Sequence, residues 1–426
     1  MNKVSMLGCA AVAGAALTTS LTVAGIAQAS PDRAAGIAQA SPDRAAVKRT
    51  HAVIVGHRGS PGQAPEETLA SYRNAMREKA DVLEGDVQLT SDKQIVLLHD
   101  DTLARTTDVE EVYPDRAPWR VGQFTLAEIK KLDAGSWFDR RYAGQRVPTL
   151  AELLKVAGRN TGLSLELKAP ANSPGVATLL AKELNAARLT DGATLRSGAY
   201  RVQVHSRDQA ALKEFHASAP KVQLSYLTGG RMLPDGELAS LAGWTVGVYA
   251  HPRATSAADV ERAHAKGLKV ISDPVDSPAE VAMAANQGYD WVTSNFAGTA
   301  RRILAGRTPF PSARGVVVDS VFPNPSGDDV QPDNSEHVLL RNTTSRPVDV
   351  GGAYLRDQAG NLMRIGDGYV IPPGSLLRVH VGPGTNRPDA YYNGLAVGFL
   401  NNTSGDTVSL FGADHSLLDV QSYIVP

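Results

Sequence analysis

The stretch AVIVGHRGSPGQAPEETLASYRNAMREK, residues 52–79, contains both kinds of element from which the fold is predicted. Its first part, Ala52 to Gly56, is a short run of β-branched residues, and its last part, Thr68 to Lys79, has the apolar spacing of an amphipathic helix. Short apolar strands that alternate with helices are typical of βα units and of a parallel sheet. We therefore expect residues 52–79 to be the first of a series of such units.

The same alternation continues to about residue 305 and gives seven further predicted strands. They are Val82 to Gln88, Leu163 to Lys168, Arg201 to Val204, Val222 to Tyr226, Thr245 to Val248, Leu268 to Ile271 and Trp291 to Thr293. Helical windows lie between them, for example Pro174 to Ala187, Ser256 to Lys266 and Ser277 to Gln287. Eight repeats in about 250 residues favour a TIM (β/α)8 barrel over an open doubly wound sheet. We therefore predict an α/β barrel over residues 52–305.

The sequence changes character after residue 305. Residues 306–314 are rich in Pro, Gly and Arg, which is typical of a linker. From residue 315 to residue 426, short alternating apolar runs are separated by clusters of Asn, Gly, Pro and Asp, which favours an antiparallel β-sandwich. We therefore predict an all-β second domain over residues 315–426.

The first 51 residues have the features of an export signal and a flexible segment. An apolar run of small residues from about Val4 to Ala24 leads to Ala27-Gln28-Ala29, an A-x-A cleavage pattern. This pattern predicts a signal peptide over residues 1–29, a flexible segment over residues 30–51 and a secreted, extracellular protein with no transmembrane segment in the mature chain. A lipoprotein anchor at Cys9 is the alternative, although the apolar run comes mainly after that cysteine.

The charge balance bears on the partners of the protein. Lys and Arg number 43 and Asp and Glu number 44, so the formal net charge is -1. Such a chain has no overall field that would attract it to nucleic acid. We therefore expect no nucleic-acid partner.

Residues with catalytic chemistry gather at the ends of the predicted strands, where barrel active sites lie. His57 and Arg58 follow the first strand. Glu84 and Asp86 lie two residues apart on the second strand and so share a face, and Glu166 has the same placement on the third. Three such acids repel one another unless a cation lies between them, and hard oxygen ligands suit Mg²⁺ or Ca²⁺. The sequence therefore predicts a site for one divalent cation.

A second histidine and a second cationic side chain complete the predicted site. His99 follows the apolar run of residues 94–98 and should also emerge from a strand. Two histidines can act as general base and general acid near neutral pH, and Arg58 and Lys168 are suited to binding phosphate oxygens. Each residue alone also has a structural explanation, such as a salt bridge between Glu166 and Lys168. Their joint occurrence indicates phosphodiester cleavage.

Four stretches resemble the glycerophosphodiester phosphodiesterases, whose signature is His-Arg, then Glu-x-Asp, then His. They are VIVGHRGSPGQAPEETLASYRNAM, LEGDVQLTSDKQIVLLHDDTLARTTD, AGSWFDRRYAGQRVPTLAELL and LSLELK, within residues 53–304. The resemblance implies a TIM barrel that uses Ca²⁺ or Mg²⁺ to hydrolyse small glycerophosphodiesters to glycerol 3-phosphate and an alcohol. It also implies the roles of seven residues: the metal ligands Glu84, Asp86 and Glu166, the acid and base His57 and His99, and the phosphate ligands Arg58 and Lys168.

The chain departs from that family pattern at three places. Pro-Glu-Asn-Thr becomes Pro65-Glu66-Glu67-Thr68, Trp-Thr-Val-Asn becomes Ile271-Ser272-Asp273-Pro274, and Gln-Ser-Phe becomes His205-Ser206-Arg207. Of the seven histidines in residues 200–426, only His205 is placed where it can face the barrel mouth. The changes concern the substrate pocket, and the new histidine and arginine favour an unusual head group.

The C-terminal region resembles the lamin tail domain, an immunoglobulin-like β-sandwich. The resemblance rests on EHVLLRNTTSRPVDVGGAYLRDQAG, IPPGSLLRVHVG and GDTVSLFGADHSLLDVQSY. No group of acids or histidines there suggests catalysis. Binding to a cell-wall polymer or another surface, and simple stabilisation of the barrel, are both compatible with this sequence.

Three functions are compatible with the whole sequence. The first is a secreted, metal-dependent glycerophosphodiester phosphodiesterase, in which water or the neighbouring glycerol hydroxyl attacks the phosphorus. The second keeps the barrel but acts on lysophospholipids, as a lysophospholipase D does, or on a teichoic polymer. The third is a catalytically inactive, surface-binding protein, which is disfavoured because none of the seven expected site residues is substituted.

Overall fold

The computed structural model describes residues 52–425. The predicted signal peptide, with Cys9, and the predicted flexible segment up to residue 51 lie outside the described residues. Within residues 52–425, no helix combines the length and the apolar character that a membrane crossing requires.

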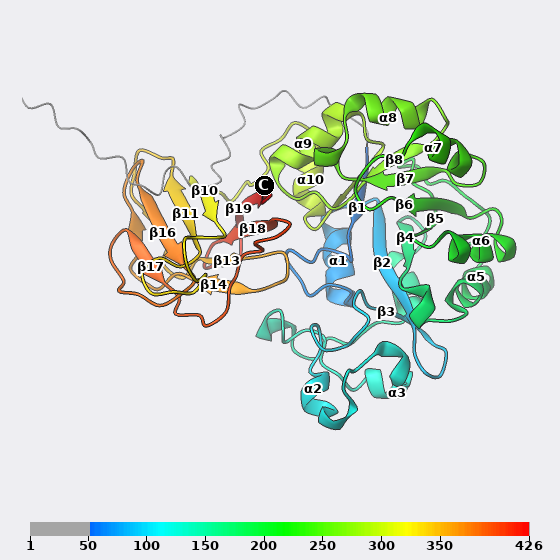
Figure 1. Cartoon of the computed structure of the whole chain (residues 1–426), viewed down its shortest axis with the longest axis horizontal. Helices are drawn as coiled ribbons and strands as arrows, with labels where there is room; N and C mark the ends of the chain where they lie inside the picture. Colours follow the sequence, from blue (N-terminus) through cyan, green and yellow to red (C-terminus); the bar gives the residue numbers. More distant parts are fainter. Residues whose placement is uncertain (1–51, 426) are drawn as a thin grey trace, which may run out of the picture. The chain divides into compact units, whose positions relative to one another are not determined.

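Eight parallel strands close into a barrel (Figure 1). They are β1 (Val53–Gly56), β2 (Val82–Leu89), β4 (Gly162–Leu167), β5 (Val202–Ser206), β6 (Gln223–Leu227), β7 (Gly247–Ala250), β8 (Lys269–Ser272) and β9 (Trp291–Ser294). Each strand is hydrogen-bonded to the next, and β1 pairs with both β2 and β9, which closes the barrel. The predicted TIM barrel is therefore confirmed.

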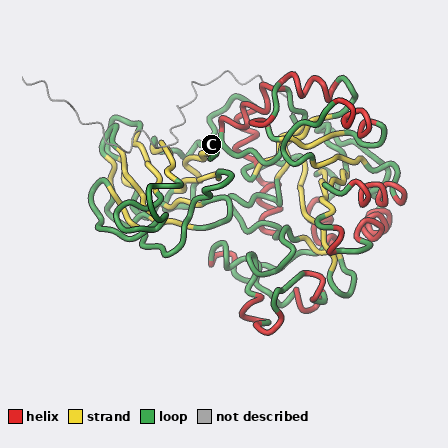
Figure 2. The backbone as a smooth tube through the Cα atoms, viewed as in Figure 1, coloured by secondary structure: helices red, strands yellow, loops and turns green. Residues whose placement is uncertain are grey.

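Helices surround this barrel, as Figure 2 shows in red around the yellow strands. They are α1 (Leu69–Arg77), α4 (Leu150–Ala157), α5 (Val176–Ala186), α6 (Gln209–Ser218), α7 (Asp235–Ala242), α8 (Ala257–His264), α9 (Pro278–Gln287) and α10 (Ala297–Leu304). Four of them begin after a Ser or Thr whose hydroxyl accepts a hydrogen bond from a backbone N–H of the first turn. These N-cap residues are Thr68, Thr149, Ser256 and Ser277.

Strand β1 buries both of its faces. Ile54 belongs to the large apolar cluster that includes helix residues such as Tyr72, whereas Val53 and Val55 belong to a second cluster with Trp291. Because side chains alternate along a strand, one face packs on the helices and the other fills the barrel interior. This arrangement fixes the position at which the chain leaves β1 and enters the loop that contains His57.

The connection from β2 to α4 is an insertion with its own small core. It begins with β3 (Ile95–Leu97), which runs antiparallel to β2, and it contains the short helices α2 (Val109–Val112) and α3 (Leu126–Ile129). Leu103, Phe124 and other buried residues form a separate apolar cluster there. The backbone N–H of Leu98 donates to the carbonyl of Asp86, 2.9 Å away, so the insertion places His99 beside the end of β2.

The C-terminal region is an all-β sandwich, as predicted. One four-stranded sheet consists of β10 (Val316–Phe322), β11 (His337–Asn342), β16 (Leu376–His380) and β17 (Ala390–Tyr392). The other consists of β14 (Leu362–Arg364), β13 (Tyr354–Arg356), β18 (Asp406–Phe411) and β19 (Leu417–Tyr423). Neighbouring strands in these two sheets are antiparallel, except that β16 and β17 are parallel, and β12 (Val348–Asp349) pairs with β15 (Val370–Ile371). Apolar side chains from both sheets form one core.

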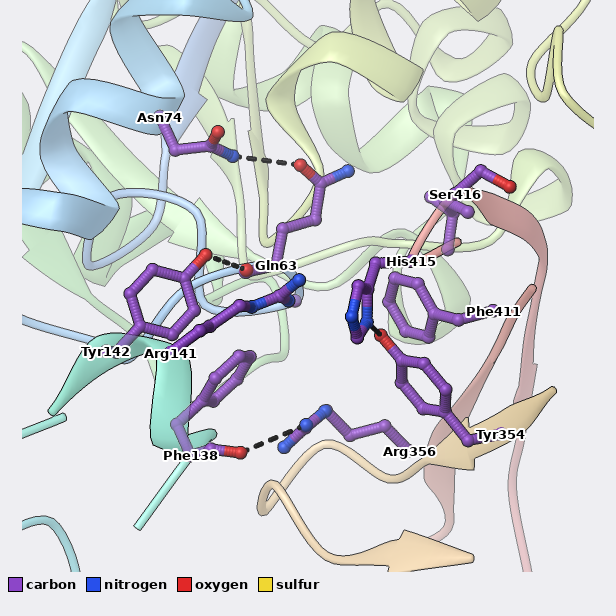
Figure 3. A pocket seen from close by; sticks show the side chains of 12 residues that line it. Gln63, Asn74, Phe138, Arg141, Tyr142, Tyr354, Arg356, Phe411, His415 and Ser416 are labelled. Atoms are coloured by element: carbon purple, nitrogen blue, oxygen red, sulfur yellow. Dashed lines mark hydrogen bonds between the residues drawn. The ribbon is translucent and has the colours of Figure 1, made fainter. Parts of the chain in front are cut away.

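The sandwich contacts the barrel through a buried arginine. Residues 52–425 lie in one compact unit, and Arg356 of β13 is only 3% exposed. Its Nη2 donates to the carbonyl oxygen of Phe138, 3.1 Å away, and its guanidinium lies 3.9 Å from the centroid of the Phe138 ring (Figure 3). The same figure shows Tyr142, whose hydroxyl donates to the carbonyl of Gln63 at 2.8 Å. The contact therefore adjoins the loop that leads from β1 to α1.

Candidate active site

Three side chains with catalytic or ligand chemistry lie in register across neighbouring strands. Asp86 of β2 pairs with Glu166 of β4, and Glu166 pairs with His205 of β5. Because residues in register present their side chains on the same face, these groups meet at the carboxyl end of the barrel. Glu84 shares the face of Asp86 from two residues earlier, and Glu84, Asp86 and His205 are at most 3% exposed.

The three acids form a buried cluster that is short of positive charge. Burial, together with the neighbouring Asp86, raises the pKa of Glu84 well above its ordinary value and that of Glu166 to about 8. Burial acts in the same direction on Asp86, but Lys168 and Arg58 outweigh it and hold the pKa of Asp86 below its ordinary range. Protein cations thus outweigh burial at Asp86, whereas burial and the charge of Asp86 prevail at Glu84 and Glu166.

Arg58 and Lys168 flank Asp86. Arg58 Nε lies 3.3 Å from Asp86 Oδ2, and Lys168 Nζ lies 3.7 Å from Asp86 Oδ1 and 3.4 Å from Glu166 Oε1. The backbone N–H of Arg58 also donates to Glu84 Oε2 at 2.7 Å. These contacts bring both predicted phosphate ligands to the edge of the acid cluster.

The donor set fits a divalent cation. One oxygen of Glu84, one oxygen of Glu166 and one ring nitrogen of His205 lie within 4.8 Å of one another. Buried carboxylates that lack partners are costly unless they ligate a metal. Of the three predicted ligands, Glu84 and Glu166 share this grouping with His205, whereas Asp86 lies beside it, against Arg58 and Lys168.

His57 is held in one tautomer by two residues that are distant in sequence. The Asn295 side-chain Nδ2 donates to Asp276 Oδ2 at 2.6 Å, so its Oδ1 faces His57 Nδ1, 2.8 Å away. Nδ1 of His57 must therefore carry the proton, which leaves the lone pair on Nε2. The burial of the ring in the barrel mouth, reinforced by Arg58, lowers the pKa of His57 to about 3. His57 is therefore a neutral imidazole that can accept a proton at Nε2.

His99 is positioned by a chain of charged groups. Its Nδ1 lies 2.7 Å from Asp100 Oδ1, and Asp100 also accepts two hydrogen bonds from Arg105, at 2.6 Å and 2.9 Å. Arg105 donates two further hydrogen bonds to Glu66, at 2.7 Å and 2.9 Å, and Glu66 contacts Arg58 Nη1 at 3.2 Å. The network connects the second histidine to the predicted phosphate-binding arginine.

The turn after β1 has a backbone that only certain residues adopt. Arg58 has a φ of 47° and Gly59 a φ of 90°, both in the left-handed region. A Cβ on Gly59 would lie 2.5 Å from Ser71 Oγ, closer than real atoms approach. The glycine therefore lets the turn lie against α1 while Arg58 N–H reaches Glu84.

Glu67, a departure from the family pattern, lies directly behind the acid cluster. It is 3% exposed and has a φ of 56°. Its Oε1 accepts a hydrogen bond from the backbone N–H of Asp86 at 2.9 Å, and its Oε2 accepts one from the hydroxyl of Tyr72. Burial and the charges of Asp86 and Glu84 raise the pKa of Glu67 well above its ordinary value. This chain thus places a fourth carboxyl group at the site.

The structure brings the seven predicted residues to one end of the barrel, where an open groove begins. Residues 166–170, at and after the end of β4, and residues 206–209, at and after the end of β5, line this groove. Sequence reasoning did not identify several residues that position the site. They are Glu66, Glu67, Tyr72, Asp100, Arg105, Asp276 and Asn295.

The comparisons with known proteins agree with this geometry. The protein-family model for the glycerophosphoryl diester phosphodiesterase family matches residues 57–299, and the model for the lamin tail domain matches residues 309–424. A glycerophosphodiester phosphodiesterase of Bacillus subtilis (strain 168) is 30% identical over 261 residues, which are 59% of this chain and 86% of the relative. Another glycerophosphodiester phosphodiesterase, from Caldanaerobacter subterraneus subsp. tengcongensis, is 34% identical over 177 residues, which are 41% of this chain and 66% of the relative.

A solved structure is similar over the same region. The Oleispira antarctica phosphodiesterase in complex with the product sn-glycerol-3-phosphate is 28% identical, with a TM-score of 0.51. The match covers 59% of this chain and 96% of that one. The similarity is thus confined to about the length of the barrel.

Proposed function

Because this chain belongs to the glycerophosphoryl diester phosphodiesterase family, we propose that it is a secreted, metal-dependent hydrolase that cleaves glycerophosphodiesters with His57 and His99 as base and acid. The observation that carries the proposal is the cluster of the carboxylates of Glu84, Asp86 and Glu166. The Lys168 ammonium lies at the edge of this cluster, and the oriented rings of His57 and His99 lie near it. The proposed product is glycerol 3-phosphate, in line with the product bound to the Oleispira antarctica relative. Secretion is proposed from the sequence of residues 1–29 alone.

Glu84, Asp86 and Glu166 are the residues that would hold the cation. When bound, a divalent cation supplies Lewis-acid polarisation of the phosphate and neutralises charge that develops in the transition state. Burial and the neighbouring Asp86 raise the pKa values of Glu84 and Glu166, and a bound cation would favour the ionised form of both.

Arg58 and Lys168 bind and orient the phosphate in this proposal. Both lie within 4 Å of Asp86, so their remaining N–H groups are available at the edge of the acid cluster. Arg58 Nε faces Asp86 Oδ2 at 3.3 Å and Nη1 contacts Glu66 Oε1 at 3.2 Å, so the guanidinium is held at the edge of the cluster, where it can donate to a phosphate oxygen. The planar guanidinium and the ammonium together fix the phosphorus in front of the attacking oxygen.

His57 acts as the base. Its Nδ1–H is held by Asn295, so its Nε2 takes the proton of the attacking oxygen, which belongs to water or to the neighbouring glycerol hydroxyl. The lowered pKa keeps the ring unprotonated over the whole neutral range.

His99 acts as the acid. Asp100 accepts from Nδ1 of His99, which fixes the orientation of the ring, and Arg105 keeps Asp100 ionised. Burial would raise the pKa of Asp100, but His99 and Arg105 lower it further than burial raises it. The protonated ring then donates from Nε2 to the oxygen of the departing alcohol.

Metal dependence is tested with the full chain and glycerophosphocholine. Exhaustive chelation should abolish the release of choline and glycerol 3-phosphate, and the addition of a single divalent cation should restore it. The variant Glu166→Gln, which removes one charge of the cluster at nearly constant size, should need a higher cation concentration for half-maximal rate. Full turnover after chelation would contradict the metal-dependent mechanism.

A further inference from the structure

We propose that His205 is a ligand of the catalytic cation through Nε2, and that this nitrogen makes the site prefer a transition ion, Mn²⁺ or Zn²⁺, over Mg²⁺ and Ca²⁺. The inference rests on the metal site of the proposed function. It changes the expected ion, because the acids alone favour Mg²⁺ or Ca²⁺.

The position of His205 Nε2 matches that of a ligand. It lies 3.8 Å from Glu84 Oε1 and 4.0 Å from Glu166 Oε2, so it makes a hydrogen bond to neither. Ligand bonds of about 2.0–2.4 Å place neighbouring ligands of one ion about 3–4 Å apart. The nitrogen and the two carboxylate oxygens therefore have the spacing of atoms that share an ion.

The surroundings of the ring aim Nε2 at the acids. On the opposite side of the ring, Nδ1 lies 3.2 Å from Ser164 Oγ, which itself lies 3.0 Å from the hydroxyl of Tyr249. The Tyr249 ring stacks on the imidazole, with centroids 4.9 Å apart and an angle of 26° between the planes. When Ser164 accepts the Nδ1 proton, the lone pair of the ring is at Nε2. Metal-ligating histidines are typically held by such a hydrogen bond from the other ring nitrogen.

The nature of this ligand bears on the choice of ion. Mg²⁺ and Ca²⁺ take oxygen ligands, whereas imidazole nitrogen suits transition ions. The chain has this histidine where the family pattern that it resembles has glutamine. Replacement of His205 by Gln is therefore the matched substitution, because it restores the residue of the family pattern, retains a polar group of similar reach and removes the imidazole ring with its ligand nitrogen.

The decisive measurement is the coupling between bound Mn²⁺ and ligand nitrogen. The chelated full-length protein is loaded with Mn²⁺ alone and studied by pulsed electron paramagnetic resonance. We expect ¹⁴N modulation in the unaltered protein, a change to the ¹⁵N frequencies after labelling with ¹⁵N-histidine, and loss of the modulation in His205→Gln. His99→Gln, which alters one of the two other histidines of the site, neither of which has a proposed ligand role, should retain the modulation.

Calorimetric titration gives the second readout. The ratio of the affinities for Mn²⁺ and Mg²⁺ should fall about tenfold or more in His205→Gln, while Mg²⁺ affinity changes little. Ser164→Ala, which removes only the partner of Nδ1, should weaken Mn²⁺ binding and keep the nitrogen coupling, and it tests the inference if His205→Gln does not fold.

The outcomes separate this inference from the proposed function. Mn²⁺ binding without any histidine nitrogen coupling in the unaltered protein would overturn the role of His205 and leave metal dependence intact. Nitrogen coupling that survives in folded His205→Gln would also overturn it. Failure of the protein to bind any divalent cation would instead contradict the metal site of the proposed function.

Discussion

The two histidines of the site have different partners, and this difference underlies the proposed roles of base and acid. His57 faces a neutral amide, Asn295, and burial lowers its pKa to about 3. His99 Nδ1 lies 2.7 Å from Asp100 Oδ1, and this contact fixes the orientation of the ring. A neutral ring suits the proposed base, and a ring oriented by a carboxylate suits the proposed acid.

Removal of His57 and removal of His99 should each lower the rate, the first by loss of the proposed base and the second by loss of the proposed acid. We expect His57→Ala and His99→Ala each to reduce kcat by about 10²-fold or more, since each loses a proton-transfer step. A glycerol phosphodiester with a p-nitrophenol leaving group needs no acid, so it should restore much of the rate of His99→Ala and little of that of His57→Ala. Steady-state kinetics with both substrates measure this difference.

Matched controls distinguish chemistry from folding in these variants. Thermal unfolding of each should resemble that of the unaltered protein. Rescue of His57→Ala in preference to His99→Ala would reverse the assignment of base and acid, and undiminished turnover in a folded variant would remove that histidine from the mechanism.

The pKa of Glu166 predicts how cation binding depends on pH. In the metal-free protein, a folded pKa of about 8 means that the native state holds a proton that the unfolded chain releases near its ordinary value of 4.5. Glu166 therefore contributes to the stability of the metal-free protein below pH 4.5, and this contribution is lost as pH rises through about 8. A cation must displace that proton, so its stabilising effect should grow as pH rises toward 8 and beyond.

This dependence is measured as the change in Tm on the addition of a saturating divalent cation. We expect a larger increase at pH 8.5 than at pH 6.5 in the unaltered protein, and a weaker pH dependence in Glu166→Gln, which has no proton to displace there. An increase in Tm that is the same at both pH values in the unaltered protein would contradict the raised pKa.

At the scale of elements, the turn between β1 and α1 holds the site together. It carries His57 and Arg58, and Gly59 allows it to pack against Ser71 of α1. The hydroxyl of Ser71 also accepts from Ser60 N–H at 2.7 Å and donates to the carbonyl of Arg58 at 2.9 Å. A displacement of this turn therefore moves the proposed base and a proposed phosphate ligand together.

Gly59→Ala should damage both stability and catalysis. The added Cβ would lie 2.5 Å from Ser71 Oγ at a φ of 90°, so we expect a loss of about 2–4 kcal/mol in the free energy of unfolding and a fall of at least about tenfold in kcat/KM. Gly198→Ala is the matched control, because Gly198 has a φ of 84° but no atom within 4 Å of the added Cβ. Gly198→Ala should lower the free energy of unfolding by only about 1 kcal/mol and leave kcat/KM unchanged. Equal effects of the two substitutions in denaturant titrations and kinetics would show that the contact with Ser71 is unimportant.

The elements of the barrel were predictable because each strand carries a local signal. All eight predicted strands overlap observed ones, and their shared parallel direction brings residues after β1, β2 and β4 to one end. Local patterns do not carry information on which distant side chains meet. Asn295 and His57 are 238 positions apart, and neither Asn295 nor Asp276 lies in a motif that identifies it.

The insertion after β3 also contains contacts that local sequence patterns do not predict. Arg105 lies in an irregular segment, and its two carboxylate partners, Glu66 and Asp100, lie 39 and five positions away. The position of His205 at the barrel mouth was predictable, but its closeness to Glu84 and Glu166 follows from the register of β2, β4 and β5, which the sequence does not show. The register of neighbouring strands thus decides the membership of the cluster.

At the scale of the whole molecule, the site belongs entirely to the barrel, but the sandwich covers part of the barrel surface. The last of the seven predicted site residues in the chain is Lys168, and among residues 52–425 the hydrogen bonds and ion pairs of these seven involve no residue of the sandwich. Phe296 forms an apolar cluster with Phe310, Tyr354 and Phe411, so a residue of the predicted linker also packs between the two regions. Binding of the sandwich to a cell-wall polymer stays a prediction.

A shortened chain that ends at Thr308 should therefore retain the chemistry and lose stability. We expect kcat and KM for glycerophosphocholine within about twofold of the full chain, because the acid cluster and both histidines are complete. The Tm should fall by several degrees, because removal of the sandwich exposes Phe296 and Phe138 to water at about 25 cal/mol for each Å² of apolar surface. Arg356→Ala in the full chain should reproduce part of that fall, since Arg356 donates to Phe138 and covers its ring.

The comparison measures turnover and Tm for the mature full chain, the shortened chain and Arg356→Ala. Tyr142 connects the interface with the site, because its hydroxyl donates to Gln63, three residues before Glu66 in the loop that follows β1. If the shortened chain folds but loses turnover on the small substrate, the sandwich must hold this loop in its active position, and Arg356→Ala should then lower kcat as well. Undiminished turnover together with a lower Tm would mean that the sandwich stabilises the barrel from outside and that its own ligand, if it has one, affects only polymeric or surface-bound substrates.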